Sequence, residues 1–443
     1  MANLFVSFLY NILLLITAPI WGVMAWMRSR RRAEKPNWKE RMGEFPIHWD
    51  TCKPLIWVHT VSVGEVVAAI PVLQELQLQW PEAQILQSVT TSTGHQVAKE
   101  KCLDAGLVDQ LVYFPIDIAR FQMIAMVRAR PVAVVIFETE LWFNFVQFAK
   151  SFGAGTLLVN GRLSDRSAPK MSALKFFYRH IFDHLDRILV QTPLDADRFL
   201  MAGAKRPEIF GNTKFDEALG LDSAMRQKQR ADFGVADEDF LIVVGSTRGD
   251  EEVDFVLAAL SRLDRAGVRV ILAPRHIENA AEILAKVQGV LGDAGLRSAG
   301  SLAPVLVLDT YGELGNLYAA ADLAVIGGGF SPLGGQNLIQ PLAWGIPVLH
   351  GEHMTNFKSA SEAALTAGAS MVVRSSDELF AALEALHADP ARRTKMGSAG
   401  KKLVEESRGA SARYATEIIK EAKSSRAFQR LLKRKSAKDA KIS

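Results

Sequence analysis

Short apolar runs recur along this chain of 443 residues, and their spacing restricts the folds that it can adopt. Most runs do not alternate apolar with polar residues, and helix-length amphipathic segments separate them. Strands of this kind, joined by helices, indicate a parallel sheet that is covered on both faces. The first series comprises "PLIWVHTV", "QILQSVTT", "DQLVYFP", "PVAVVIFET", "TLLVNG", "DRILVQT" and "PEIFGNT". The second comprises "FLIVVGST", "VRVILAPRH", "PVLVLDT", "ADLAVIGGG", "IPVLHG" and "ASMVVRS".

A polar, strand-poor stretch, "GLDSAMRQKQRADFGVADEDF", separates the two series. The length of the chain also favours more than one domain. We therefore predict an α/β protein with two doubly wound, Rossmann-like domains, residues 34–222 and 223–405, which face each other across a cleft. A long charged helix is expected from about Pro390 to Ala422, and residues 406–443 are expected to form a C-terminal helix and a basic tail.

The N-terminal stretch "LFVSFLYNILLLITAPIWGVMAWM", from Leu4 to Met27, contains no charged residue. Its length is enough to cross a hydrocarbon core of about 30 Å. Four arginines follow within five residues, which places the body of the protein in the cytoplasm by the positive-inside rule. The positive charge follows the apolar run, unlike in a cleaved signal peptide. We predict that residues 1–33 form a single-pass membrane anchor with its basic flank; a helix lying flat on the membrane is the alternative.

The net charge of +4 is unevenly distributed. Residues 28–41 carry seven Lys or Arg and two Glu, a net of +5, and residues 423–443 carry eight against one Asp, a net of +7; the rest of the chain therefore sums to −8. Basic ends on an acidic body argue against nucleic-acid binding and fit contact with anionic inner-membrane lipids, although solvated tails would have the same composition. The chain has two cysteines, which favours a reducing compartment.

In the first domain, polar residues follow the predicted strands, where parallel sheets bind ligands. In "WVHTVSVGEV", Glu65 stands where a helix should begin, so its carboxylate either stabilises the helix dipole or takes part in catalysis. Glu138 and Glu140 follow the run "VAVVIF". The other candidates, in "TTSTG", "NGRLSDRS" and "GNTKFD", are Thr93, Gly94, Arg162, Arg166 and Lys214, of which the cations could bind an anionic substrate.

In the second domain, three loops could bind a phosphate. "VVGSTRG" offers Ser246 and Thr247, and "ILAPRH" offers Arg275, a natural bidentate phosphate ligand. The segment "VIGGGFSPLGGQNLIQP" contributes the candidates Gly329, Ser331, Gly334, Gly335, Asn337 and Gln340. Glycines let the backbone approach a ligand closely, and a helix start offers N–H groups to an anion. The segment lacks the Walker and dinucleotide patterns, and a tight strand-to-helix turn is the structural alternative.

No metal site is predicted. Asp195 and Asp197 have the spacing of a metal-binding Asp-x-Asp, but "TPLDADRFLMAG" is typical of a helix start with acids near its dipole. His350 and His353 lack a third ligand nearby in the sequence.

Taken in order, the motifs "VHTVSVGEV", "TTSTGHQVA", "ETELWFNF", "NGRLSDRS", "GNTKFD", "APRH" and "GGGFSPLGGQN" with "QPLAWGIPV" resemble those of the 3-deoxy-D-manno-octulosonic acid (Kdo) transferases of Gram-negative bacteria. The resemblance runs to about residue 405 and implies a membrane-anchored, inverting glycosyltransferase of the GT-B architecture. Such an enzyme transfers Kdo from CMP-Kdo to the 6′-hydroxyl of a lipid A precursor, without a metal cofactor, on the inner membrane. The resemblance gives Glu65 the role of general base, makes Glu138 functionally important, and places Arg275 and residues 331–337 at the CMP site.

Four positions depart from the family pattern. Gln336 replaces a His, Gln340 replaces a Glu that commonly bonds the donor ribose, Phe143 replaces a Pro and Asn279 replaces an Arg. Two alternatives stay open: a GT-B enzyme that uses a UDP-sugar, such as a lipid A disaccharide synthase, and a catalytically inactive membrane-bound homologue that acts as a binding or scaffold protein, which Gln336 and Gln340 favour.

Overall fold

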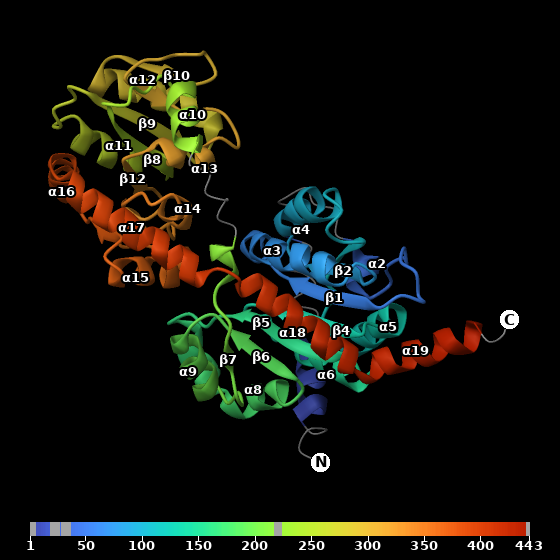
Figure 1. The fold of residues 1–443 in the computed structure, drawn as a ribbon. Helices are drawn as coiled ribbons and strands as arrows, with labels where there is room; N and C mark the ends of the chain where they lie inside the picture. Colours follow the sequence, from blue (N-terminus) through green and yellow to red (C-terminus); the bar gives the residue numbers. More distant parts are fainter. Residues whose placement is uncertain (1–5, 18–26, 28–36, 217–223, 440–443) are drawn as a thin grey trace. The chain divides into compact units, whose positions relative to one another are not determined.

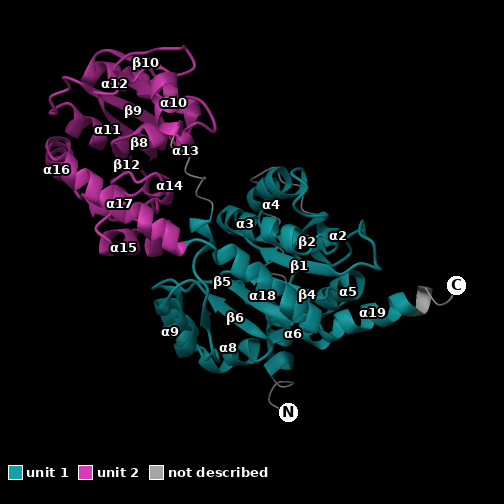
Figure 2. Cartoon of the chain, viewed as in Figure 1, with its two compact units in different colours: residues 1–216, 408–443 teal, residues 217–407 magenta. Residues whose placement is uncertain are grey.

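The computed structural model describes residues 6–17, 27, 37–216 and 224–439. The chain divides into two compact units, coloured separately in Figure 2. Unit 1 comprises Met1–Asp216 together with Arg408–Ser443, and unit 2 comprises Glu217–Ser407.

Unit 1 contains a seven-stranded sheet of order β3-β2-β1-β4-β5-β6-β7, in which every pairing is parallel. Its strands are β1 (Leu55–Thr60), β2 (Gln84–Val89), β3 (Gln110–Tyr113), β4 (Ala133–Phe137), β5 (Gly155–Gly161), β6 (Arg187–Val190) and β7 (Glu208–Ile209). All seven predicted runs contain a strand. The chain builds outward from β1 to β3 and then returns to add β4 on the other side of β1, so the order switches between β1 and β4.

Helices cover both faces of this sheet (Figure 1). They are α2 (Trp38–Arg41), α3 (Val63–Gln79), α4 (Ser92–Ala98), the π-helix η1 (Lys99–Leu103), α5 (Ala119–Ala129), α6 (Phe143–Ser151), α7 (Ser167–Ala173), α8 (Lys175–Phe182), α9 (Pro193–Met201), the 3-10 helix η2 (Thr213–Phe215), α18 (Ala410–Ser424) and α19 (Arg426–Asp439). One buried core includes residues of α5, α6 and α9, and another includes residues of α3 and α18. Strand residues contribute to both cores because successive side chains point to opposite faces.

The last helices of the chain belong to unit 1 rather than to unit 2. The single helix expected from about Pro390 to Ala422 is interrupted, because α17 ends at Ser407 and Gly409, with a φ of 82°, precedes α18. Asp216 fixes this break: its carboxylate accepts the N–H groups of Gly409 at 2.6 Å and Ser411 at 2.7 Å. The helix α18 passes so close to the sheet that a Cβ at Gly155 would lie 2.9 Å from the Glu421 carbonyl oxygen.

Unit 2 contains a second seven-stranded parallel sheet, of order β10-β11-β9-β8-β12-β13-β14. Its strands are β8 (Phe240–Thr247), β9 (Val268–Pro274), β10 (Ala294–Leu296), β11 (Val305–Val307), β12 (Leu323–Ile326), β13 (Val348–His350) and β14 (Ser370–Val372). All six predicted runs contain a strand, whereas β10 was not predicted, since its three residues Ala-Gly-Leu give no strand pattern. The order switches between β8 and β12, which makes β8 the counterpart of β1.

The helices of unit 2 also lie on both faces of its sheet (Figure 1). They are α10 (Ala224–Asp232), α11 (Gly249–Leu260), η3 (Ile277–Asn279), α12 (Ala280–Leu291), α13 (Leu314–Leu317), η4 (Tyr318–Ala320), α14 (Ile339–Ala343), η5 (Thr355–Phe357), α15 (Lys358–Thr366), α16 (Ser376–Ala388) and α17 (Pro390–Ser407). The prediction of two doubly wound α/β halves is therefore confirmed.

Part of the predicted membrane anchor is described: residues 6–17 form a helix, here called the N-terminal helix, while residues 4–5 and 18–26 lie outside the described residues. One face of this helix is docked on unit 1. Tyr10 donates a hydrogen bond to Asp117 at 2.9 Å, and the side chains of Asn11 and Asn144 donate to each other at 3.1 and 3.0 Å. Within the ranges that the structure describes, none of the helices combines the length and apolar character that a membrane crossing needs.

Candidate functional site

The candidate residues gather beyond the carboxyl ends of the strands that flank the two switch points, where doubly wound sheets bind ligands. In unit 1, Glu65 follows β1 and Glu138 follows β4, which pairs with β1. In unit 2, Ser246 and Thr247 end β8, and the glycine-rich segment follows β12, which pairs with β8. The sheet topology thus explains why motifs far apart in the sequence meet within each unit.

Glu65 is the third residue of α3, and its carboxylate turns back toward the end of β1. One oxygen accepts the N–H of Val61 at 2.7 Å, and the other accepts the hydroxyl of Ser62 at 3.2 Å. This contact resembles a capping box, in which an acid in the first turn satisfies an N–H before the helix. Glu65 therefore has a structural role at the start of α3, as the helix-start interpretation predicts. With 8% of its surface exposed, the residue nevertheless retains contact with solvent.

Glu65 is buried near two other carboxylates, a surrounding that a helix cap does not need. Burial, with the nearby carboxylates of Glu138 and Glu140 in addition, raises the pKa of Glu65 to about 8. Burial, together with Glu138, also raises the pKa of Glu140. With its pKa raised to about 8, Glu65 keeps its proton over much of the range near neutral pH. Such a group can exchange protons with a ligand at physiological pH.

Backbone strain marks the same strand ends. Glu138, Asn160 and Ser246 are non-glycine residues with φ values of 56°, 52° and 61°, and each lies at or near the carboxyl end of a central strand. A left-handed conformation costs of order 1 kcal/mol for such residues and concentrates at functional sites. Two of the three, Glu138 and Ser246, were candidates on sequence grounds alone.

The other unit 1 candidates surround this strand edge in different ways. Gly94 is buried at the start of α4, and a Cβ there would lie 3.2 Å from the carbonyl carbon of Ser62, so glycine allows α4 to pack on the turn that carries Glu65. The Arg162 carbonyl accepts the Thr139 hydroxyl at 2.7 Å, which joins the loop of Glu138 to the next loop. Of the remaining candidates, Thr93 is an exposed residue of α4 and Arg166 is the exposed N-cap of α7. Lys214 is a half-buried residue of η2.

In unit 2, the predicted phosphate-binding loops are joined by their backbones. The N–H of Arg275 donates to the carbonyl of Thr247 at 2.9 Å, while the side chain of Arg275 is exposed and forms no ion pair within the described part of the chain. The hydroxyl of Thr247 is buried without a hydrogen-bond partner among the described residues. An exposed guanidinium and an unpaired buried hydroxyl beside one strand end are both able to bind an added ligand.

Backbone conformation and close packing explain why glycine occupies two positions in the segment after β12. Gly334 and Gly335 have φ values of 93° and 74°, and a Cβ at either would lie 2.4 Å from Asn356 or Met354 respectively. The N–H of Gly335 already donates to the carbonyl of Gly328 at 2.6 Å. The tight-turn interpretation therefore accounts for these two glycines, and their role in donor binding remains a prediction.

A residue that the sequence prediction missed organises this segment. Glu252 of α11 is 1% exposed, and its carboxylate accepts four hydrogen bonds: from the N–H groups of Gly328 (2.6 Å), Arg248 (2.8 Å) and Phe330 (3.1 Å) and from the hydroxyl of Ser331 (3.4 Å). The sequence gives only a partial signal, since "GSTRGDEE" places three acids in the first turn after the first strand, where Glu65 also lies in unit 1. The N–H groups of Gly328 and Phe330 thus have a protein acceptor already.

The remaining donor candidates lie where this segment enters α14. Gly329 is buried, and Ser331, Asn337 and Gln340 are partly buried. The Asn337 side chain accepts the N–H of Ile339, the first residue of α14, at 2.9 Å.

The helix-start interpretation of Asp195 is confirmed. The helix α9 begins at Pro193, and the Asp195 carboxylate accepts the Leu163 N–H at 3.0 Å and the Thr192 hydroxyl at 2.6 Å. Among the residues that the structure describes, no group of three or more His, Cys, Asp or Glu is placed to hold a metal ion.

Solved structures share the fold at low identity. The UDP-GlcNAc 2-epimerase from Neisseria meningitidis, bound to UDP-GlcNAc, aligns with a TM-score of 0.59 at 13% identity over 82% of this chain and 99% of that one. MurG from Acinetobacter baumannii aligns with a TM-score of 0.55 at 14% identity over 83% and 99%. These similarities concern the fold and support the predicted GT-B class.

Sequence comparison is more specific. A family profile described as 3-deoxy-D-manno-octulosonic-acid transferase (kdotransferase) matches residues 36–217. The 3-deoxy-D-manno-octulosonic acid transferase of Chlamydia pneumoniae is 32% identical over 328 residues, 72% of this chain and 74% of the relative. That of Bordetella pertussis is 34% identical over 414 residues, 88% of this chain and 94% of the relative. Because this similarity covers nearly the full length of both chains, the protein is an enzyme of the 3-deoxy-D-manno-octulosonic acid transferase family.

Proposed function

We propose that this chain transfers Kdo from CMP-Kdo to the 6′-hydroxyl of a lipid A precursor (lipid IVA), with inversion at the sugar, in lipopolysaccharide biosynthesis. Family membership supports Kdo transfer. The observation that carries the mechanism is the Glu65 carboxylate, which lies beyond β1 at the switch point with its pKa raised to about 8. A base whose pKa lies near the working pH is well suited to remove a proton from a sugar hydroxyl.

In the proposed step, Glu65 takes the proton of the acceptor hydroxyl as its oxygen forms a bond to the anomeric carbon of Kdo. The bond from that carbon to the phosphate oxygen of CMP breaks, and its electron pair leaves with CMP. Glu138 raises the pKa of Glu65 and so keeps the base near its working range. The general acid–base contribution expected of Glu65 is of order 10²- to 10⁴-fold in rate.

The leaving CMP gains negative charge, which fixed donors can stabilise. We assign this role to the exposed guanidinium of Arg275 and the unpaired hydroxyl of Thr247. The other residues proposed for the donor are Ser246, Gly329, Ser331, Gly334, Gly335, Asn337 and Gln340. The residues proposed for the acceptor or the transferred sugar are Thr93, Gly94, Arg162, Arg166 and Lys214. Transfer is proposed to need no divalent metal, so a chelator should leave the rate unchanged.

The N-terminal segment is proposed to attach the enzyme to the cytoplasmic face of the bacterial inner membrane. Away from the docked face, the N-terminal helix exposes apolar side chains, which are Phe8, Leu9, Leu13, Leu15 and Ile16. The docked face uses Ser7, Tyr10 and Asn11 in hydrogen bonds to unit 1. Polar groups held against the protein body favour the alternative in which residues 6–17 lie along the membrane surface. Replacement of Leu13 and Ile16 by Ser should weaken the attachment of the enzyme to membranes in fractionation.

Incubation of the purified enzyme with CMP-Kdo and a tetra-acylated lipid A precursor tests the proposed reaction. We expect a Kdo-bearing lipid product, with inhibition by CMP and none by UDP. Inhibition by UDP instead would identify a UDP-sugar enzyme. The absence of any product, with CMP still bound, would identify an inactive homologue, and either result would refute the proposal.

A further inference from the structure

A groove of about 820 Å³ lies in unit 1 at the amino ends of the sheet strands, away from the candidate site. Its walls are α19, the segment before β1 and the end of α5 with the loop to β4. Its lining includes the cations Lys53, Arg128, Arg130, Arg430, Arg434 and Lys435. It also includes the apolar residues Ile47, Trp49, Leu55, Val127, Phe152 and Leu431. Leu55 begins β1, whereas Glu65 follows its carboxyl end, so a strand of six residues, roughly 20 Å, separates the groove from the proposed base.

The charge of the groove is of one sign. Six Lys or Arg side chains line it, and none of the described residues that line it is Asp or Glu. None of the six forms an ion pair with a described residue, although several are oriented by carbonyl groups: Arg128 donates to Phe45 at 2.9 Å, and Arg430 donates to Phe152 at 3.3 Å. A guanidinium group that donates one N–H to a carbonyl oxygen still has other N–H groups available, which suits the binding of phosphate oxygens.

The floor of the groove is apolar and partly exposed. Ile47 and Val127 are 40% and 46% exposed, and Phe152 and Leu431 are partly covered. A soluble anion would gain nothing from these side chains, whereas an amphiphile can place a phosphate among the cations and an acyl chain on the floor. The combination of six cations and an apolar floor therefore fits an anionic lipid.

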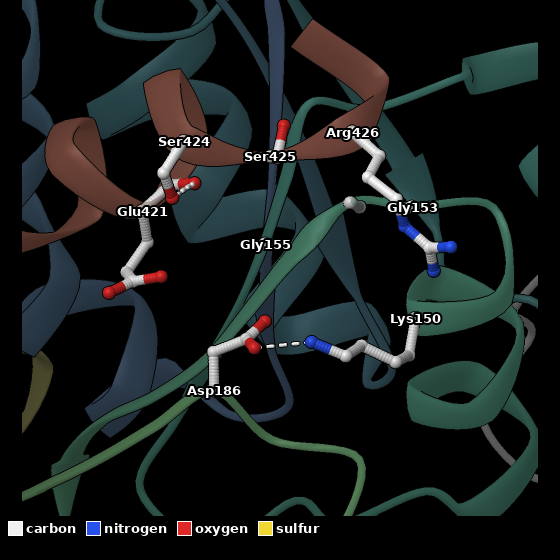
Figure 3. A pocket seen from close by; sticks show the side chains of 9 residues that line it. Lys150, Gly153, Gly155, Asp186, Glu421, Ser424, Ser425 and Arg426 are labelled. Atoms are coloured by element: carbon white, nitrogen blue, oxygen red, sulfur yellow. Dashed lines mark hydrogen bonds and ion pairs between the residues drawn. The ribbon is translucent and has the colours of Figure 1, made fainter. Parts of the chain in front are cut away.

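A neighbouring cavity of about 140 Å³ shows that this charge is not general at the strand ends (Figure 3). Its lining includes Lys150, Asp186, Glu421 and Arg426, two cations and two carboxylates. The Lys150 side chain points to Asp186 and pairs with it, as the dashed line in Figure 3 shows. One cation of this cavity is thus paired with a carboxylate of the same cavity, whereas none of the described residues that line the groove is a carboxylate.

We propose that this groove is a docking site for an anionic phospholipid of the bilayer, with the headgroup phosphate bound by Arg430, Arg434 and Lys435 of α19 together with Arg128. It would add a second membrane contact to that of the N-terminal segment, and it does not depend on the proposed transfer reaction.

Flotation of the full chain with phosphatidylcholine vesicles, with and without phosphatidylglycerol, tests the site. We expect R430S/R434S/K435S to lower the apparent affinity for the anionic vesicles, obtained from the fraction recovered with them, by at least about tenfold. The matched control K170S/K395S/K433S removes three exposed charges outside the groove and should float like the wild type. The charge-neutral variant I47S/V127S should also bind anionic vesicles less tightly.

Equal losses in the groove and control variants would overturn the proposal, because bulk charge would then explain binding. Unchanged flotation of the groove variant would overturn it too. Weaker binding by the charge variant but not by I47S/V127S would identify a site for the phosphate group alone, which also contradicts the proposal. CMP binding and Kdo transfer in detergent should be unaffected in all variants, so failure of the groove and failure of the proposed reaction are separate results.

Discussion

The two units place a buried carboxylate at the same point of the same architecture, and the two carboxylates differ in their hydrogen bonds. Glu65 and Glu252 each lie in the first turn of the helix that follows the first strand of a doubly wound sheet. Glu252 is 1% exposed and accepts four hydrogen bonds. Glu65 is 8% exposed, accepts two, and lies near two other carboxylates.

This difference supports the proposal that Glu252 has a structural role whereas Glu65 acts as the base. The four hydrogen bonds to Glu252 hold the segment after β12 in one conformation. Glu65 has fewer donors and faces like charges, so its proton is easily gained and lost near neutral pH. Under this proposal, a first-turn carboxylate at the same point of the fold serves two different purposes in the two units.

The largest effect is expected for Glu65→Gln. The amide keeps the size of the side chain but cannot accept the proton, so kcat should fall by about 10³-fold, whereas the melting temperature should hardly change. Steady-state transfer assays and thermal unfolding measure the two quantities. Glu75→Gln, on the same helix, is the matched control. A kcat within a few fold of wild type would show that Glu65 is only a helix cap, like its counterpart in unit 2.

For Glu252→Ala we expect the reverse pattern. Loss of the acceptor leaves buried N–H groups of Gly328 and Phe330 unpaired, which should lower the free energy of unfolding by about 3 kcal/mol. CMP affinity should fall with it, because the donor segment loses its fixed conformation. Denaturant unfolding and calorimetric CMP titration provide the measurements, and Glu251→Ala, one residue earlier and exposed, is the control. Unchanged stability would mean that the four contacts contribute little.

The pH dependence sharpens the contrast further. Because Glu65 must be ionised to act as a base, kcat/KM should rise with pH through about 8. Glu138→Gln removes a like charge, so this rise should move to lower pH. The pKa of Glu65 is also higher in the folded chain than in the unfolded chain, where it is about 4.5. Its contribution to the free energy of unfolding is therefore complete below about pH 4.5 and is lost as the pH rises to about 8. A rise in activity that stays at the same pH in Glu138→Gln would contradict the coupling.

The smallest effect is expected for Ser62→Ala. It removes the 3.2 Å hydrogen bond to the Glu65 carboxylate, which is worth about 1 kcal/mol or less. The ionised form loses a donor, so the rise in kcat/KM should move to slightly higher pH, opposite to the shift in Glu138→Gln. A pH–rate profile of both variants on one protein preparation tests the pair, and shifts in the same direction would refute the assignment.

Much of the fold follows from the sequence because parallel strands that are buried on both faces form uninterrupted apolar runs. Of the fourteen strands that the described residues form, the runs predict thirteen, but the three-residue β10 has no such run. The break before α18 was missed because Gly409 has positive φ for a tertiary reason, the contact with Asp216. Glu65 could be identified as a candidate from its motif. The role of Glu252 could not, because it depends on N–H groups supplied by residues more than 70 positions away.

The contribution of α18 to the core of unit 1 has a consequence for biosynthesis. As the chain leaves the ribosome, the strands of the first sheet emerge early, yet the helix that buries one face of that sheet follows only after all of unit 2. During this delay an apolar surface that ends up beneath Tyr414 and Ile418 stays uncovered. The N-terminal half should therefore need chaperone protection until residue 424 has been synthesised, and truncation before Arg408 should yield an insoluble product.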